Sequence, residues 1–270
     1  MITGSPDGAR TLPEAADGKD TDRARSNHEL GTLYSRYREK GRATEIANFA
    51  GSFYRPQLLR LPDGWGEAEH RIAFVGREPH GAVGRKTCTE ICTLKDFFDR
   101  DGSVEELIAA YDSSDDDMYS GPQKNFQRYF VKVVENMRAF GYTVKAIQTN
   151  LVKCAVNGQL HRGNSDYSLW PEPYREPYLH WQCDLLAGEF SVIKPTFILF
   201  ATLLSYIKGE FPGVRPWAID GFPANRAERL EHPRLPCPAY RAYHPGAHVS
   251  DGFAPYTAIL KDWSDRLAAA

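Results

Sequence analysis

Residues 72–75 read Ile-Ala-Phe-Val, and the turn Gly76-Arg77-Glu78-Pro79-His80-Gly81 follows them directly. Three further short apolar runs, at residues 144–151, 196–200 and 240–243, also lead into small or polar residues. Short apolar runs bounded by turn residues are typical of strands that are buried on both faces of a sheet. The sequence therefore predicts four buried strands.

Apolar residues at helical spacing fill most of the gaps between these runs. They recur every three or four residues from Leu30 onward, and again in four later segments: 125–140, 178–193, 203–211 and 256–267. Strands that alternate with helices favour a mostly parallel sheet covered on both faces. We predict an α/β fold, a three-layer α/β/α arrangement around a central four-stranded, mostly parallel sheet.

The composition is that of an ordinary globular protein, with 270 residues, 42% of them hydrophobic and 25% charged. This length fits one large domain or two small ones, and we expect one, spanning residues 29–270. Residues 1–28 contain too few large apolar side chains to offset the entropy of ordering them, so we expect a disordered tail there. The formal net charge of −2 argues against coating nucleic acid by bulk electrostatics, but leaves a local basic groove open.

The sequence shows no pattern that predicts a targeting signal. It contains no run of about 18 apolar residues and no apolar segment behind a positively charged start, so we expect neither a membrane span nor a secretory signal. We expect a cytoplasmic monomer. The five cysteines are odd in number and widely spread, which favours reduced core thiols or metal ligands over a disulfide framework.

Two segments interrupt the alternation of strands and helices. Residues 99–122 include the run Ser-Ser-Asp-Asp-Asp at 113–117, which is typical of a solvated surface insertion; a metal-binding loop is the alternative. Residues 157–177 are rich in Pro, Tyr and Trp, and fit either a lid or a packed surface excursion.

The polar residues of greatest interest follow the predicted strands. Glu78 follows the first strand, Asn150 ends the second, and His244 follows the fourth. In an open α/β sheet, ligands bind where loops leave the carboxyl ends of the strands. We therefore expect this carboxylate, amide and imidazole to converge at one edge of the sheet.

This set resembles the uracil-DNA glycosylase superfamily. The resemblance lies in the Gly-x-acid-Pro turn at 76–79, the strand that ends in Asn150, and the His244-Pro245-Gly246 segment, in that chain order. Residues 149–154, Thr-Asn-Leu-Val-Lys-Cys, are similar to the Asn-Val-Val-Lys-Cys stretch of the iron–sulfur branch. The resemblance covers roughly residues 72–267.

The resemblance implies a hydrolase that removes uracil or a similar deaminated base from DNA. Glu78 would orient or deprotonate the attacking water and favour the cationic sugar, while His244 would hold negative charge on the leaving base. Asn150 would pair with the adjacent N–H and carbonyl of uracil. The target base would be flipped out of a duplex or taken from a single strand.

Further contacts follow from the same resemblance. Phe97 or Phe98 would stack on the flipped base, with core packing as the alternative. Gly76 and His80 would border the base, with a solvent-facing histidine as the alternative for His80. Lys153 would meet a phosphate or a nearby carboxylate. The loop after His244 would contact DNA through three further residues: Gly246, His248 and Val249. Turn and capping roles remain the alternative for Glu78, Asn150 and His244.

The cysteine layout differs from that of the iron–sulfur relatives, which carry a Cys-x-x-Cys near the N-terminus. Here the four relevant cysteines are Cys88, Cys92, Cys154 and Cys183. We expect buried free thiols and no cofactor or metal, with an iron–sulfur cluster on these four as the alternative. Arg77 is also unusual beside Glu78; if the two pair, Arg77 would keep the carboxylate ionised while lowering its basicity.

A second hypothesis is a nucleic-acid-binding or sensing module on the same fold that has lost the chemistry. It predicts salt-dependent binding to uracil-containing DNA without an abasic product. A third, an unrelated nucleotide hydrolase, would need a glycine-rich phosphate loop or a metal-binding carboxylate cluster, and the sequence shows neither convincingly.

Overall fold

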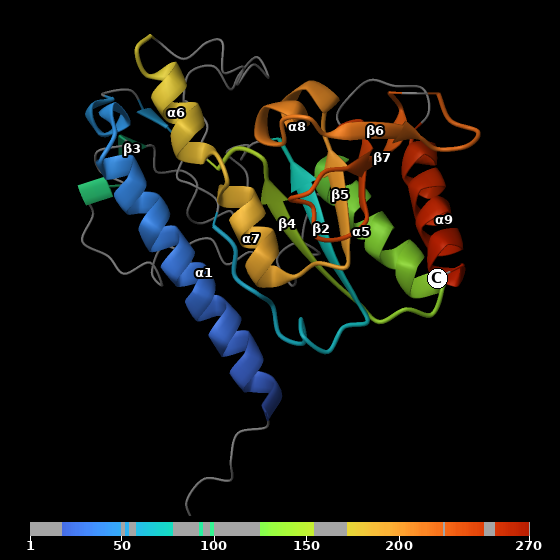
Figure 1. Ribbon diagram of the computed structural model, residues 1–270. Helices are drawn as coiled ribbons and strands as arrows, with labels where there is room; N and C mark the ends of the chain where they lie inside the picture. Colours follow the sequence, from blue (N-terminus) through green and yellow to red (C-terminus); the bar gives the residue numbers. More distant parts are fainter. Residues whose placement is uncertain are drawn as a thin grey trace, which may run out of the picture.

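The chain folds around a six-stranded mixed sheet in a computed structural model (Figure 1). The structure describes residues 18–49, 52–53, 58–77, 92–93, 98–99, 125–153, 172–223, 225–245 and 252–269. The strands are β2 (His70–Gly76), β4 (Val144–Asn150), β5 (Phe197–Ala201), β6 (Arg215–Ala218), β7 (Ala227–Glu231) and β8 (Ala239–Ala242). Their order in the sheet is β4-β2-β5-β8-β7-β6.

All four predicted strands are confirmed, as β2, β4, β5 and β8. They pair in parallel with one another, and β5 and β8 are buried along their whole length. Helical crossovers on both faces account for this burial, because they leave neither face of a parallel sheet open to water. The predicted α/β class is therefore correct.

The prediction of a four-stranded sheet is wrong, because β7 and β6 extend the sheet beyond β8 in antiparallel orientation. Their sequences, Ala-Glu-Arg-Leu-Glu and Arg-Pro-Trp-Ala, contain no apolar run. All four residues of β6 are exposed. An edge strand needs no buried face, so the pattern that reveals core strands misses these two.

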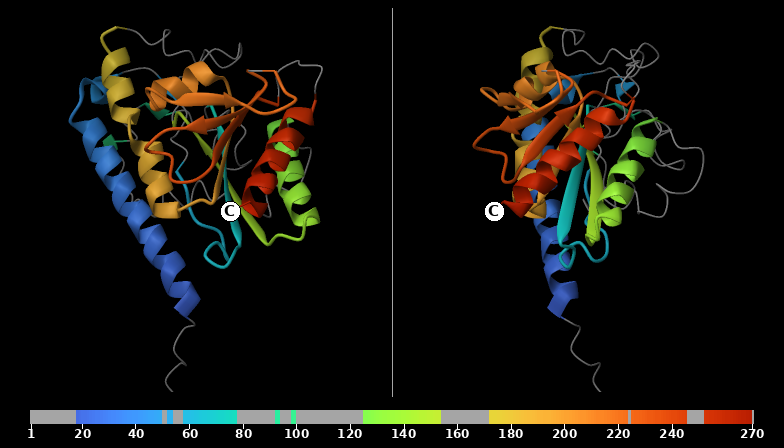
Figure 2. Two further views of the ribbon diagram at one scale, coloured as in Figure 1. Left: turned by 45° about the vertical axis from the view of Figure 1, so that its right-hand side comes forward. Right: turned by 90° about the vertical axis from the view of Figure 1, so that its right-hand side faces the viewer.

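Helices pack on both faces of the sheet (Figure 2). They are α1 (Gly18–Arg42), α5 (Asn125–Ala139), α6 (Arg175–Gln182), α7 (Leu185–Ile193), α8 (Leu204–Glu210) and α9 (Ala254–Ala268). One core, between the sheet and helices α1, α6, α7 and α8, contains Val75, Phe200 and Trp181. The other, against α5 and α9, contains Phe74 and Leu199. A short 3-10 turn, η1 (Glu45–Asn48), and a two-stranded sheet of β1 (Ser52–Phe53) and β3 (Cys92–Thr93) complete the described elements.

Helix α1 begins at Gly18, inside the segment 1–28 that we expected to be a tail. Residues 1–17 lie outside the described residues. Arg23 forms an ion pair with Asp63, and Leu61 donates its backbone N–H to Oδ1 of Asn27 at 2.9 Å. These contacts and the helix propensity of Lys, Arg and Ala extend a helix that packing nucleates further along the chain.

The predicted helix at 178–193 is divided into α6 and α7 by Asp184, which has a left-handed φ of 70°. Most of segments 99–122 and 157–177 lies outside the described residues. Among the described helices, none is both long and apolar enough to cross a membrane.

The order of the parallel strands places a topological switch point at the end of β2. Its neighbours are β4 on one side and β5 on the other, so the chain leaves β2 for one side of the sheet and later returns on the other. In doubly wound sheets, ligands bind at this switch point, outside the carboxyl ends of the strands. The topology therefore directs attention to the residues that follow β2, β4, β5 and β8.

Candidate functional site

Gly76 and Asn150 lie side by side where β2 and β4 end, because the parallel register pairs them directly. Asn150 is 2% exposed. A methyl group on Gly76 would overlap Oδ1 of Asn150 and lie 3.1 Å from Cζ of Phe126. The Asn150 amide therefore lies over the end of β2, in space that is free because residue 76 has no side chain.

Phe126 connects this amide to His244. It belongs to the first turn of α5, and its ring lies against Phe74 with centroids 4.8 Å apart. The His244 ring stacks on Phe126 at 5.5 Å with an interplanar angle of 26°. Two of the predicted site residues, Asn150 and His244, thus share a neighbour at the carboxyl edge of the sheet.

Arg77 extends the site toward β5. Its guanidinium carbon lies 3.8 Å from the ring centroid of Tyr206 in α8. A guanidinium stacked on an aromatic ring keeps its N–H groups in the plane for hydrogen bonding. A positive charge is therefore held on the β5 side of Gly76. Glu78, the next residue in the chain, lies outside the described residues.

Behind Asn150, a buried ion pair secures the end of β4. Lys153 is 1% exposed, and its Nζ lies 2.6 Å from Oε2 of the fully buried Glu189 in α7. Lys153 Nζ also donates to Oγ1 of Thr149, which in turn donates to Oε2 of Glu189 at 3.3 Å. Lys153 therefore meets a carboxylate, and its burial keeps it from the DNA phosphate that was the alternative.

The same network reaches helices α1 and α6. Tyr34 of α1 donates its hydroxyl to Oε1 of Glu189 at 2.8 Å, and the backbone N–H of Lys153 donates to Oε1 of Gln182 at 2.9 Å. Burial raises the pKa of Glu189, against the opposing effects of Lys153 and these hydrogen bonds. Three helices thus fix the turn that follows Asn150, since buried polar networks of this kind are rigid when each group has a partner.

The structure places Phe98 in the hydrophobic core, which was the alternative to the base-stacking role expected from the sequence. The centroids of its ring and the Trp181 ring are 5.2 Å apart, and the Phe98 ring packs against Gly41. Phe98 is 1% exposed. It belongs to the core on the α1 face, whereas Phe126 packs on the α5 face. Phe98 is therefore not brought together with Asn150 and His244.

Eight predicted residues lie outside the described part of the chain: Glu78, His80, Cys88, Phe97, Cys154, Gly246, His248 and Val249. Of the four cysteines considered for a cluster, Cys92 is in β3 and Cys183 follows α6 as an exposed free thiol. Cys183 thus differs from the buried thiol expected. Within the described residues, no group of three His, Cys, Asp or Glu side chains could hold a metal ion.

The sequence interpretation missed Phe126 and Tyr206. Phe126 lies in the first turn of α5, in the connection between the parallel strands β2 and β4, and Tyr206 lies in the first turn of α8, directly after the parallel strand β5. Such a helix starts at the carboxyl edge of the sheet, because the chain must return to the opposite edge before the next parallel strand. Aromatic residues at these helix starts were therefore the available signal.

Comparisons with known protein families and with curated proteins give no match to this chain.

Proposed function

We propose that this protein is a DNA glycosylase-like hydrolase that cleaves the N-glycosidic bond of uracil or a similar deaminated base. The observation that carries the proposal is the arrangement of Asn150, Gly76, Phe126 and His244 at the carboxyl edge of the sheet. An amide and an imidazole at this edge match two of the three roles that base removal requires. The resemblance of the turn 76–81 to the glycosylase superfamily supplies the third role through Glu78.

Asn150 is suited to base recognition. Its amide offers one acceptor and two donors, which complement the adjacent carbonyl and N–H of uracil. With the side chain 2% exposed, a base that mismatches it would leave buried polar groups unpaired, at a cost of about 1–3 kcal/mol each. The lysine–glutamate network behind β4 limits the movement of this amide.

His244 is suited to stabilising the leaving base. Its stacking on Phe126 fixes the plane of the imidazole, so that an N–H can point at a base oxygen as negative charge develops there. A preorganised donor of this kind lowers a barrier by about 2.7–4 kcal/mol in enzymes. Glu78 would orient the attacking water, and Arg77 brings a positive charge to the β5 side of the site, which would favour an anionic nucleotide there.

Release of uracil from single- and double-stranded oligonucleotides tests the proposal. The wild type is expected to leave alkali-labile abasic sites, and His244→Ala and Glu78→Ala to lose most of that activity. Salt-dependent binding of uracil-containing DNA without any abasic product would contradict the hydrolase and indicate the sensing module instead.

A further inference from the structure

The hairpin formed by β6 and β7 carries polar and aromatic groups on one exposed face. Its register pairs Trp217 with Arg229 and Arg215 with Glu231. Paired residues of an antiparallel ladder point to the same face, and residues two apart on one strand also share a face. Arg215, Trp217, Arg229 and Glu231 therefore lie together.

Trp217 is 46% exposed. In the part of the chain that the structure describes, its ring stacks on no other side chain and its indole N–H has no hydrogen-bond partner. Arg215 and Arg229 lie on the same face of the hairpin as this ring. The folded chain therefore offers an open aromatic platform with cations next to it.

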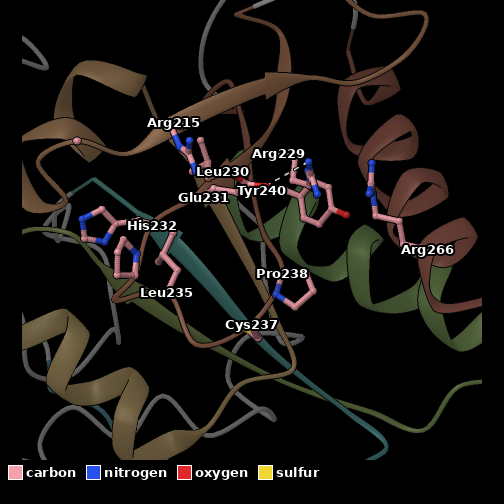
Figure 3. A pocket seen from close by; sticks show the side chains of 12 residues that line it. Arg215, Arg229, Leu230, Glu231, His232, Leu235, Cys237, Pro238, Tyr240 and Arg266 are labelled. Atoms are coloured by element: carbon pink, nitrogen blue, oxygen red, sulfur yellow. Dashed lines mark hydrogen bonds and ion pairs between the residues drawn. The ribbon is translucent and has the colours of Figure 1, made fainter. Parts of the chain in front are cut away.

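A cavity of about 570 Å³ lies beside this face (Figure 3). Leu230, Pro238 and Tyr240 are among its lining residues, and so are Arg215, Arg229 and Arg266. The cavity is at the amino end of β8, whereas His244 follows the carboxyl end of the same strand. It is thus separate from the site described above.

The charges around the cavity favour an anion. Arg215 and Arg229 both form ion pairs with the Glu231 carboxylate, with nitrogen–oxygen distances of 3.3 and 3.4 Å. Asp262 accepts from Arg266 at 2.8 Å and from the Tyr240 hydroxyl at 2.9 Å. Three guanidinium groups thus face two carboxylates, and each guanidinium has five N–H donors. A net positive charge and donors remain for a ligand.

We propose that the β6–β7 face is a second nucleic-acid contact, which binds a single strand by stacking a base on Trp217 and holding phosphates on Arg215, Arg229 and Arg266. Aromatic platforms flanked by cations are the usual means of binding single strands without reading their sequence. The alternative occupant, a second copy paired along the edge of β6, is disfavoured by Pro216. Proline has no N–H to give to a neighbouring strand, and its place in an edge strand hinders such pairing.

Binding of a fluorescein-labelled oligodeoxyadenylate of about fifteen nucleotides, followed by anisotropy at several salt concentrations, tests the proposal. The probe contains no uracil, so its binding is independent of the proposed base chemistry. Trp217→Ala is expected to weaken binding roughly tenfold, and Trp217→Phe to retain most of it. Arg215→Ala is expected to lower the slope of log K against log salt by about 0.7.

Arg25→Ala is the matched control for Arg215→Ala. Both side chains are 71% exposed and each contacts one glutamate, but Arg25 lies on α1. The control removes the same charge and is expected to leave affinity and slope unchanged. Equal weakening by both variants, or no binding of the probe by the wild type at low salt, would overturn the proposal. So would a dimer, seen by sedimentation, that Trp217→Ala dissociates while probe binding is unchanged.

Discussion

The Asn150 amide occupies the space that a side chain on Gly76 would need, since a methyl group there would overlap Oδ1 of Asn150. This relationship joins the ends of two adjacent parallel strands, β2 and β4. It explains a glycine at the end of a buried strand without any need for unusual backbone angles. It also makes the position of the Asn150 amide dependent on residue 76.

Gly76→Ala is therefore expected to displace Asn150. The added methyl group should cost about 1–3 kcal/mol of stability, as overpacking in a core does. It should also lower kcat/KM for uracil release by at least about tenfold, since displacements of about 1 Å in a site have effects of this size. Denaturant unfolding and a base-release assay measure the two effects.

Gly66→Ala is the control, because a methyl group at residue 66 would meet no atom within 4 Å. It should leave stability and activity close to those of the wild type. If Gly76→Ala behaves in the same way, the amide does not depend on residue 76.

The stacking of His244 on Phe126 predicts a second effect. Phe126→Leu keeps an apolar side chain but removes the ring, and aromatic pairs are worth about 0.5–1.5 kcal/mol beyond their buried area. The rate of base release should fall about threefold to tenfold. Phe140→Leu changes the same residue type at a site that is 59% exposed and should have no effect; a similar rate for both variants would contradict the role of Phe126.

The buried Lys153–Glu189 pair should show strong coupling in a double-mutant cycle. Lys153→Met leaves the Glu189 carboxylate buried without its cation and should destabilise the fold by about 3–5 kcal/mol. Adding Glu189→Leu should restore much of that loss, because no isolated charge then remains. Denaturant unfolding of the wild type, both single variants and the double variant measures the coupling.

Lys261 and Asp265 provide the comparison, because their charged atoms are also 2.6 Å apart but both side chains are mostly exposed. Their coupling should be far smaller, since water screens exposed pairs. Additive losses in the buried cycle would show that the pair does not hold the end of β4.

Glu210 predicts a loss of stability at alkaline pH. Burial raises the pKa of its carboxyl to about 8, with smaller effects from Lys153 and Glu189, and Oε1 has no hydrogen-bond partner among the residues that the structure describes. The folded state therefore binds this proton more tightly than the unfolded state. The stabilisation is complete below the ordinary pKa of 4.5 and is lost as pH rises toward 8.

Glu210→Gln should match the wild type at pH 5 and exceed its stability by up to about 4 kcal/mol at pH 9. Thermal and denaturant unfolding across this range measure the difference. The exposed Glu67→Gln serves as the control and should follow the wild type at both values. If the difference in unfolding free energy between Glu210→Gln and the wild type is the same at both pH values, Glu210 does not titrate in this window.

The sequence predicts the four parallel strands of the sheet because burial on both faces requires continuous apolar runs, as in Phe197–Ala201. It does not predict β6, because all the residues of this strand are exposed. Pairing with β7, and not burial, makes this segment a strand. The start of α1 at Gly18 was missed for a related reason. A helix that is nucleated by packing extends through polar residues that show no apolar periodicity.

The place of Asn150 at the end of a strand was predictable, because an apolar run leads directly into it. The partner of Lys153 was not, because Glu189 is 36 residues away and resembles any other helical glutamate in sequence. Phe126 and Trp217 could not be predicted for the same reason. Their roles depend on which elements the tertiary fold leaves beside them, and spacing along the chain does not record this.

Uracil release from a single oligonucleotide substrate, compared among the wild type, Asn150→Ala, His244→Ala and the exposed-histidine control His28→Ala, is the decisive measurement. We predict that the wild type and His28→Ala release the base at equal rates. The Asn150 and His244 variants should each be slower by about 100-fold or more, the effect of removing one preorganised hydrogen-bonding group. Full activity in both of these variants, or no release by the wild type, would contradict a base-excising site at the ends of β2, β4 and β8.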